Sequence, residues 1–205
     1  MFARIDFAVL FFIAIALLSG TSPAAETAAN AKLDAPLPEG WPEPGKPGEI
    51  AVKSYPAYRS AVAKSGATMQ RADGVLFWQL FAHIQANQIA MTAPVVNTYS
   101  ASDDKRQVEM EFLYRTTEQG QTGDGLGQVQ VQDHPQQSFV TLVVQGNMNA
   151  EVYQQSLKQL KSWLSGNPQW KLNGDPRRLG YHGPMTPQAK RIWEVQIPVE
   201  SVKME

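Results

Sequence analysis

Cysteine is absent from the 205-residue chain, which excludes a disulfide, a thiol nucleophile and a lipid anchor on cysteine. Histidine is scarce: His83, His134 and His182 stand far apart, without the i, i+4 spacing that lets one helix face bind zinc. No glycine-flanked serine resembles a nucleophile elbow. Because the commonest catalytic groups are missing, we expect a protein that is not an enzyme.

An excess of charge of one sign is missing as well. The chain has 18 Lys and Arg against 19 Asp and Glu, a formal net charge of −1, and no long basic run. Proteins that bind nucleic acid or an anionic membrane carry basic surfaces, so we expect neither partner. In a phosphate loop the glycines come directly after a strand and begin a helix. The glycines of TTEQGQTGDGLGQ have neither neighbour, so this stretch is interpreted as a flexible linker.

The first quarter of the chain differs from the rest. Residues 1–25 combine Arg4, an apolar run over residues 7–18 and small residues after it, the pattern of a secretory signal peptide. An uncleaved anchor is the alternative. We expect export to the periplasm or the medium, with no membrane contact after cleavage. Residues 26–48 contain five prolines and predict a flexible tether, from which Trp41 could still fold back.

The remaining chain, residues 49–205, is the predicted domain, and two of its segments have helical periodicity. In residues 73–87 apolar side chains recur every three or four positions behind Asp73, a good N-cap residue. A second helix is predicted from Asn149, its N-cap, to a stop at Gly166.

Strands with period-two alternation surround both helices. In residues 108–114 the apolar positions alternate with Glu109 and Glu111, which we expect on solvated surface. The order strand, helix, paired strands occurs twice along the chain. This repetition predicts an α+β domain of two related halves, with both helices on one side of a curved sheet.

Aromatic and thioether side chains favour a binding role over a catalytic one. Four tryptophans outside the tether offer area and polarizability that suit a flat apolar ligand, although such residues also fill cores. His83 lies at the edge of an apolar helix face, so it is either a ligand to iron or a residue at the core boundary. His182 lies in a loop and has the same two interpretations, whereas His134 precedes a proline and is interpreted as a turn residue.

One stretch connects these features to a known family. FWQLFAHIQANQIAMTAPV, residues 77–95, resembles the signature of the SOUL haem-binding family, in which an amphipathic helix runs into a strand of this type. Weaker similarities are EIAVKSYPAYRSA to the first strand of the family, LGYHGPMTP to a late loop and RIWEVQIPV to the closing strand. The resemblance covers about residues 49–200.

The resemblance implies a pseudo-twofold α+β domain. Two strand–helix–strand–strand halves would form a distorted β-barrel with two main helices, as in effector-binding domains. It further implies that haem or a related tetrapyrrole binds in an apolar groove, in a carrier, scavenger or sensor. Arg59, Lys64 or Arg71 would pair with the propionates. The candidate ligand-binding residues are His83, His182, Met91, Tyr181, Trp78 and Arg59, with His83 or His182 as the ligand to haem iron.

Departures from the family pattern keep other functions open. Ser54 stands where some members carry a histidine proposed to bind iron, so ligation of that kind is not expected. A pocket for another apolar molecule, a hydrolase on the same fold and a domain without a ligand are the alternatives. The mark of a hydrolase would be a buried glutamate beside a polar partner, such as Glu194, which alternates with Trp193 and Val195.

Overall fold

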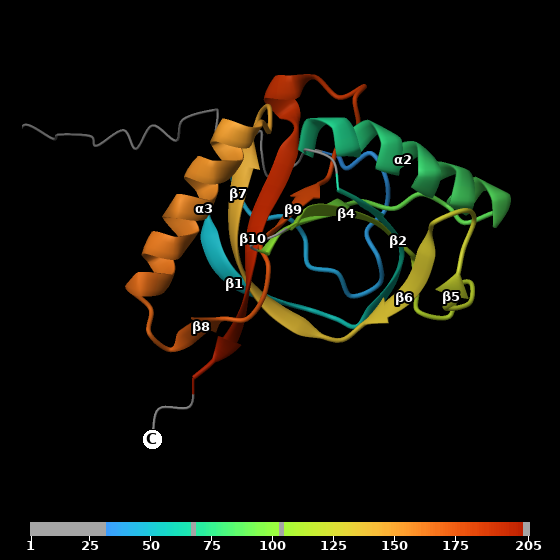
Figure 1. Cartoon of the computed structure of the whole chain (residues 1–205). Helices are drawn as coiled ribbons and strands as arrows, with labels where there is room; N and C mark the ends of the chain where they lie inside the picture. Colours follow the sequence, from blue (N-terminus) through green and yellow to red (C-terminus); the bar gives the residue numbers. More distant parts are fainter. Residues whose placement is uncertain (1–31, 67–68, 103–104, 203–205) are drawn as a thin grey trace, which may run out of the picture.

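The computed structural model describes residues 32–66, 69–102 and 105–202. One strongly curved sheet carries two helices on its outer, convex side (Figure 1). The helices are α2 (Met69–Ala86) and α3 (Ala150–Ser165), and one 3₁₀ turn, η1, spans Gln188–Lys190. The strands are β1 (Ile50–Tyr55), β2 (Tyr58–Ser65), β3 (Val95–Ser102), β4 (Lys105–Leu113), β5 (Gly123–Asp124), β6 (Gln130–His134), β7 (Gln137–Gln145), β8 (Trp170–Leu172), β9 (Arg177–Gly180) and β10 (Ile192–Ser201).

The sheet follows the order β1-β7-β10-β9-β3-β4-β2-β6-β5, with β8 attached to β10. Every pairing is antiparallel. The outermost strands, β1 and β5, do not pair with each other, so the sheet is curved but not closed. The α+β class is therefore confirmed, and the barrel remains open at one side.

The two predicted halves are visible in the strand order. Strand β2, helix α2 and strands β3 and β4 form the first half, and β7, α3, β9 and β10 repeat that order in the second. Strand β1, which precedes the first half, pairs with β7 of the second half. Strand β6, which precedes the second half, pairs with β2 of the first half. The two halves therefore exchange their outer strands. Strands β3 and β9 join the halves at the middle of the sheet.

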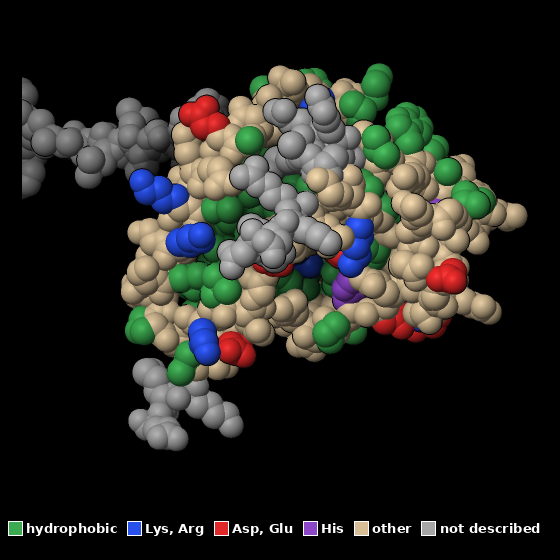
Figure 2. Space-filling view, in the orientation of Figure 1, with side chains coloured by type: hydrophobic (Ala, Val, Ile, Leu, Met, Phe, Trp, Pro, Cys, Tyr) green, Lys and Arg blue, Asp and Glu red, His purple; other side chains and the backbone are tan. Residues whose placement is uncertain are grey.

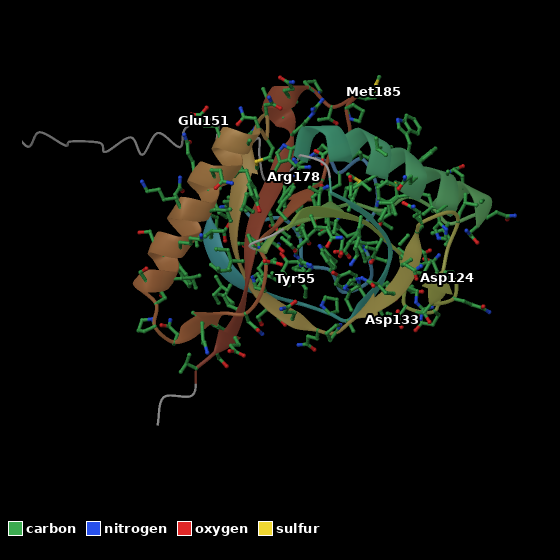
Figure 3. All side chains as sticks on the ribbon, viewed as in Figure 1. Tyr55, Asp124, Asp133, Glu151, Arg178 and Met185 are labelled. Atoms are coloured by element: carbon green, nitrogen blue, oxygen red, sulfur yellow. The ribbon has the colours of Figure 1, made fainter. Side chains whose placement is uncertain are left out.

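The capping residues behave differently in the two helices. Asn149 caps α3 as predicted, because its side-chain oxygen accepts from the Val152 amide at 2.8 Å. Helix α2 begins at Met69, so the predicted N-cap Asp73 is wrong. The carboxylate of Asp73 instead accepts from Arg178 Nη2 at 3.0 Å. Arg178 comes from β9 and lies between the two helices (Figure 3).

Buried side chains fill both sides of the sheet. One group lies under α2, and it includes Leu76, Leu80, Ile84 and Phe112. A second lies under α3, and it includes Tyr153, Leu157, Leu160 and Val195. A third lies on the concave side, which neither helix covers, and it includes Trp41, Tyr55, Tyr58, Phe139 and Leu179. The concave side is therefore a packed interior as well.

The signature segment is a loop before a strand and not itself a strand. Strand β3 begins only at Val95, after a cis peptide bond between Ala93 and Pro94. The Thr92 hydroxyl donates to the Leu113 carbonyl at 2.6 Å, and the Ala93 amide donates to the Pro36 carbonyl at 3.0 Å. The segment thus connects α2, β4 and the N-terminal chain.

Within the described ranges no helix is long and apolar enough to cross a bilayer. The predicted signal peptide and residues 26–31 of the predicted tether lie outside the described residues.

Substitution of Gly180 tests the packing at the centre of the sheet. An added Cβ would lie 2.6 Å from the Trp193 ring, so Gly180→Ala should lower the free energy of unfolding by about 1–3 kcal/mol. Gly74 in α2 is exposed and an added Cβ meets nothing within 4 Å, so Gly74→Ala should raise it by about 0.5–1 kcal/mol. Urea denaturation measures both, and equal effects of the two substitutions would contradict this packing.

Candidate ligand-binding groove

Two glutamates occupy equivalent positions in the two halves. Glu111 of β4 pairs with Val96 of β3, Glu194 of β10 pairs with Leu179 of β9, and Val96 pairs with Leu179. Residues paired in an antiparallel sheet point to the same face, so both carboxylates point to the concave side. Glu111 is 3% exposed and Glu194 is fully buried.

Glu194 accepts hydrogen bonds from four side chains. Lys53 Nζ donates to one carboxylate oxygen at 2.6 Å. The hydroxyls of Tyr55 and Tyr181 each donate to the other oxygen at 3.0 Å, and the Gln196 amide donates to it at 2.8 Å. Tyr55 lies inside the curve of the sheet (Figure 3).

Glu111 has its own set of partners. Its Oε2 accepts from Ser60 Oγ at 2.9 Å and from the Tyr58 hydroxyl at 3.3 Å. His134 Nε2 lies 3.2 Å from the same oxygen and 2.8 Å from Ser60 Oγ. The imidazole of His134 stacks on the Tyr58 ring at 4.3 Å between centroids.

Arg177 joins the two carboxylate clusters. Its Nε donates to the Gln196 side chain at 2.9 Å, and its Nη1 donates to the Tyr58 hydroxyl at 3.2 Å. The guanidinium lies 3.6 Å above the centre of the Phe139 ring. Its Nη2 is buried and has no hydrogen-bond partner in the part of the chain that the structure describes. One polar network, which we call the groove network, therefore runs from Lys53 to His134 across both halves. We call the concave side of the sheet along these residues the groove.

The tyrosines in this network remain protonated at neutral pH. Burial, and next the charge of Glu194, raises the pKa of Tyr55 and Tyr181 well above the ordinary value near 10. Burial and the charge of Glu111 do the same to the pKa of Tyr58. Each phenol is thus held as a hydrogen-bond donor.

The N-terminal chain crosses the concave side over this network. We call residues 32–48 the strap; the segment passes inside the curve of the sheet (Figure 1). Trp41 is the strap residue that folds back, and its indole lies 4.8 Å from the Tyr55 ring and 5.2 Å from the Tyr58 ring, edge to face. Leu33 and Leu37 pack beside it. A hollow of about 690 Å³ is lined by strap residues 32–41, Glu43 and Arg115.

The location of Glu111 corrects the expected solvated surface. The polar face of β4 is the concave face, and the strap and the tyrosines cover it where Glu111 lies. Farther along β4, Glu109 is partly accessible and pairs with Lys64 at 2.7 Å. Glu194 was the glutamate named as the mark of a hydrolase, and it is buried beside polar partners.

Both candidate histidines use Nδ1 as a hydrogen-bond acceptor within the domain. His83 accepts from the Leu126 amide through Nδ1 at 3.0 Å, so its Nε2 carries the proton and donates to the Tyr114 hydroxyl at 2.9 Å. Burial lowers the pKa of His83. His182 accepts from the Ile192 amide through Nδ1 at 3.1 Å, so its proton also lies on Nε2.

Of the other candidates, Tyr181 alone lies in the groove network. Met91 packs against the core under α2. Trp78 is 66% exposed on the outer side of α2, where hydrophobic side chains gather (Figure 2). Arg59 is paired with Asp133 at 2.7 Å on an outer strand. The side chain of Arg71 lies outside the described residues.

The groove residues that sequence reasoning missed come from strand ends and from the strap. In the sequence, the polar residues Glu194 and Gln196 interrupt an otherwise apolar stretch. That interruption was the available signal for a polar cluster on one face of this strand. The missed residues are Trp41, Lys53, Tyr55, Tyr58, Glu111, Phe139, Arg177 and Gln196.

Residues 43–198 match the family described as SOUL heme-binding protein. The chain belongs to this family. No curated protein sequence matches it significantly.

Solved structures with this fold are similar at low identity. The C-terminal domain of EcmrR superposes with a TM-score of 0.63 at 19% identity, over 75% of this chain and 98% of that domain. EcmrR in a DNA complex gives 0.60 at 18% identity, again over 75% of this chain and 58% of that one. A protein titled a hydrolase from Listeria innocua gives 0.51 at 8%, over 75% of this chain and 93% of that one. These likenesses show a common fold.

Neither candidate histidine is prepared to bind haem iron. Coordination through Nε2 of His83 or His182 would need the proton to move to Nδ1, which already accepts an amide hydrogen bond. No group of three His, Asp or Glu side chains in residues 32–202, apart from the gaps at 67–68 and 103–104, is placed to hold a metal.

Alkaline titration tests the burial of the tyrosines. Burial raises the pKa of all six in the folded chain. Little tyrosinate absorbance at 295 nm should therefore develop by pH 10 in the native protein, whereas the urea-unfolded chain should be about half titrated there. Because the folded state holds these protons more tightly, stability should fall as the pH rises above about 10. Normal titration of the native protein would contradict the structure.

Proposed function

We propose that the chain binds haem or a related tetrapyrrole in the groove on the concave side, as a carrier, scavenger or sensor. Membership of the SOUL family supports this ligand class. Export through the predicted signal peptide is part of the proposal and would place the protein in the periplasm or outside the cell.

The observation that carries the proposal is the environment of Arg177. Its guanidinium is buried among the rings of Phe139, Tyr55 and Trp41, and its Nη2 amino group has no partner among the described residues. A carboxylate is the preferred partner of a guanidinium, and flat rings stack or pack edge-on against tyrosine and phenylalanine. A tetrapyrrole supplies both a flat apolar ring and propionate carboxylates.

In this proposal the protein holds the ring without a bond to iron. The histidines are engaged in internal hydrogen bonds, so affinity comes from the apolar ring surface and the propionates. Tyr55, Tyr58 and Phe139 would contact the ring, and Arg177 would pair with a carboxylate. Lys53 pairs with Glu194, and Arg177 donates to the Tyr58 hydroxyl that contacts Glu111, so two cations lie near the two buried glutamates.

Hydrolysis is the second candidate, and Glu194 is the observation that favours it. A buried carboxylate beside the hydroxyls of Tyr55 and Tyr181 is a common arrangement for acid–base chemistry. Its oxygens, however, accept from four protein donors, one of them Lys53. A carboxylate that accepts four hydrogen bonds from the protein suits a structural role better than that of a base that takes a proton from a substrate.

A paired titration tests the proposed function. Haemin and metal-free protoporphyrin IX should both bind the purified protein saturably, one to one, with dissociation constants within about threefold, because the iron contributes no bond. His83→Ala and His182→Ala should change neither constant by more than about threefold. Soret absorbance follows haemin, and porphyrin fluorescence follows the metal-free ring.

Two results would contradict this account. Binding of haemin alone that is lost in one histidine variant would show that iron ligation holds the ligand. Weak, non-saturating association of both compounds would remove the tetrapyrroles as ligands of this groove.

A further inference from the structure

The strap is fastened to the domain near both of its ends. At the outer end the Asp34 carboxylate accepts from the Gly183 amide at 2.6 Å and from the Thr186 hydroxyl at 3.0 Å. At the inner end the Gly48 amide donates to the Val143 carbonyl at 2.8 Å. Asp34 and its contacts are exposed to solvent, so water competes with the outer attachment, whereas the inner one continues into β1.

Between these ends the strap contacts the groove through its backbone as well as through Trp41. The Pro36 carbonyl accepts from the Ala93 amide, and the Leu37 carbonyl accepts from the Arg115 guanidinium. The Glu43 carbonyl accepts from Lys53 Nζ at 2.9 Å. Lys53 also donates to Glu194, so one ammonium group connects the strap to the buried network.

Trp41 fills the apolar part of the groove but not its polar part. Trp41 is 5% exposed, and its ring lies edge-on to those of Tyr55 and Tyr58. Its indole N–H is buried toward the Tyr181 hydroxyl but makes no hydrogen bond of normal geometry. The Nη2 of Arg177, in the same group of side chains, also has no partner among the described residues. Buried donors without acceptors are costly, so a ligand that brings acceptors would satisfy this site better than the strap does.

We propose that the strap is an intramolecular occupant of the groove, so that Trp41 and a flat aromatic ligand compete for one place beside Tyr55, Tyr58 and Arg177. This proposal rests on the proposed function and adds its regulation. Ligand binding requires release of Trp41. Only molecules with an open strap can bind, so the apparent affinity is the intrinsic affinity multiplied by the open fraction. Two glycines give the strap turns that residues with a side chain rarely adopt. Gly40, next to Trp41, has a φ of +70°, and Gly48 has a φ of +83°.

The test combines two substitutions in the strap with a free aromatic ring. Trp41→Gly should bind protoporphyrin IX at least about tenfold more tightly than the unaltered protein, because closed molecules no longer compete. Indole, which matches the missing side chain, should raise the melting temperature of this variant and weaken its porphyrin binding. Asp34→Ala keeps Trp41 and its packing, removes the outer attachment and should tighten porphyrin binding by about threefold.

Trp163→Gly is the matched control. Trp163 lies on α3, partly buried against the core under that helix, and belongs to a different cluster from Trp41. Its loss should lower stability without changing porphyrin affinity. If Trp41→Gly fails to fold, Asp34→Ala carries the test alone.

The outcomes separate this inference from the proposed function. Unchanged porphyrin affinity in both strap variants, with no effect of indole, would overturn the inference and leave the function standing. Stabilisation of Trp41→Gly by indole, without porphyrin binding to any variant, would overturn the tetrapyrrole function and support a groove for a single aromatic ring.

Discussion

Two carboxylates buried on one face of the sheet constrain the interior of this protein. An ionised carboxylate away from water is strongly destabilising unless charges and hydrogen-bond donors surround it. Glu194 and Glu111 obtain these donors from β1, β2, β10, the end of β6 and the chain just after β9, and Arg177 connects the two sets. The halves are therefore held together by polar contacts on the concave side as well as by the β3–β9 pairing.

The pseudo-twofold relation places the glutamates symmetrically but gives them different partners. Glu194 has a lysine and two tyrosines, whereas Glu111 has a serine, a tyrosine and a histidine. Arg177 lies between the two sets and donates to Gln196 beside Glu194 and to Tyr58 beside Glu111. The concave side thus carries different polar groups in its two halves. On the convex side Arg178, the next residue, is buried between the helices and pairs with Asp73.

Much of the fold could be predicted from the sequence, because periodicity and order along the chain report on helices, strands and repeats. The repeated halves and the Asn149 cap are of this kind. Glu111 shows the limit: alternation separates the two faces of a strand but does not tell whether a distant segment covers the polar one. The five prolines of residues 26–48 indicate an extended chain, and extension alone does not show that Trp41 would be buried. For His83, periodicity gave a position at the edge of the helix face, whereas its hydrogen-bond partners Tyr114 and Leu126 come from the chain just after β4 and from a later loop.

Amide hydrogen exchange tests most directly whether the ligand site lies beneath the strap. The amides of Ala93 and Gly183 donate to strap residues Pro36 and Asp34, whereas the Tyr114 amide donates to Arg59 within the sheet. If saturating protoporphyrin IX displaces the strap, exchange at Ala93 and Gly183 should accelerate while exchange at Tyr114 stays unchanged. Bound porphyrin with unchanged or slower exchange at Ala93 and Gly183 would contradict the account, because the ligand would then lie outside the groove.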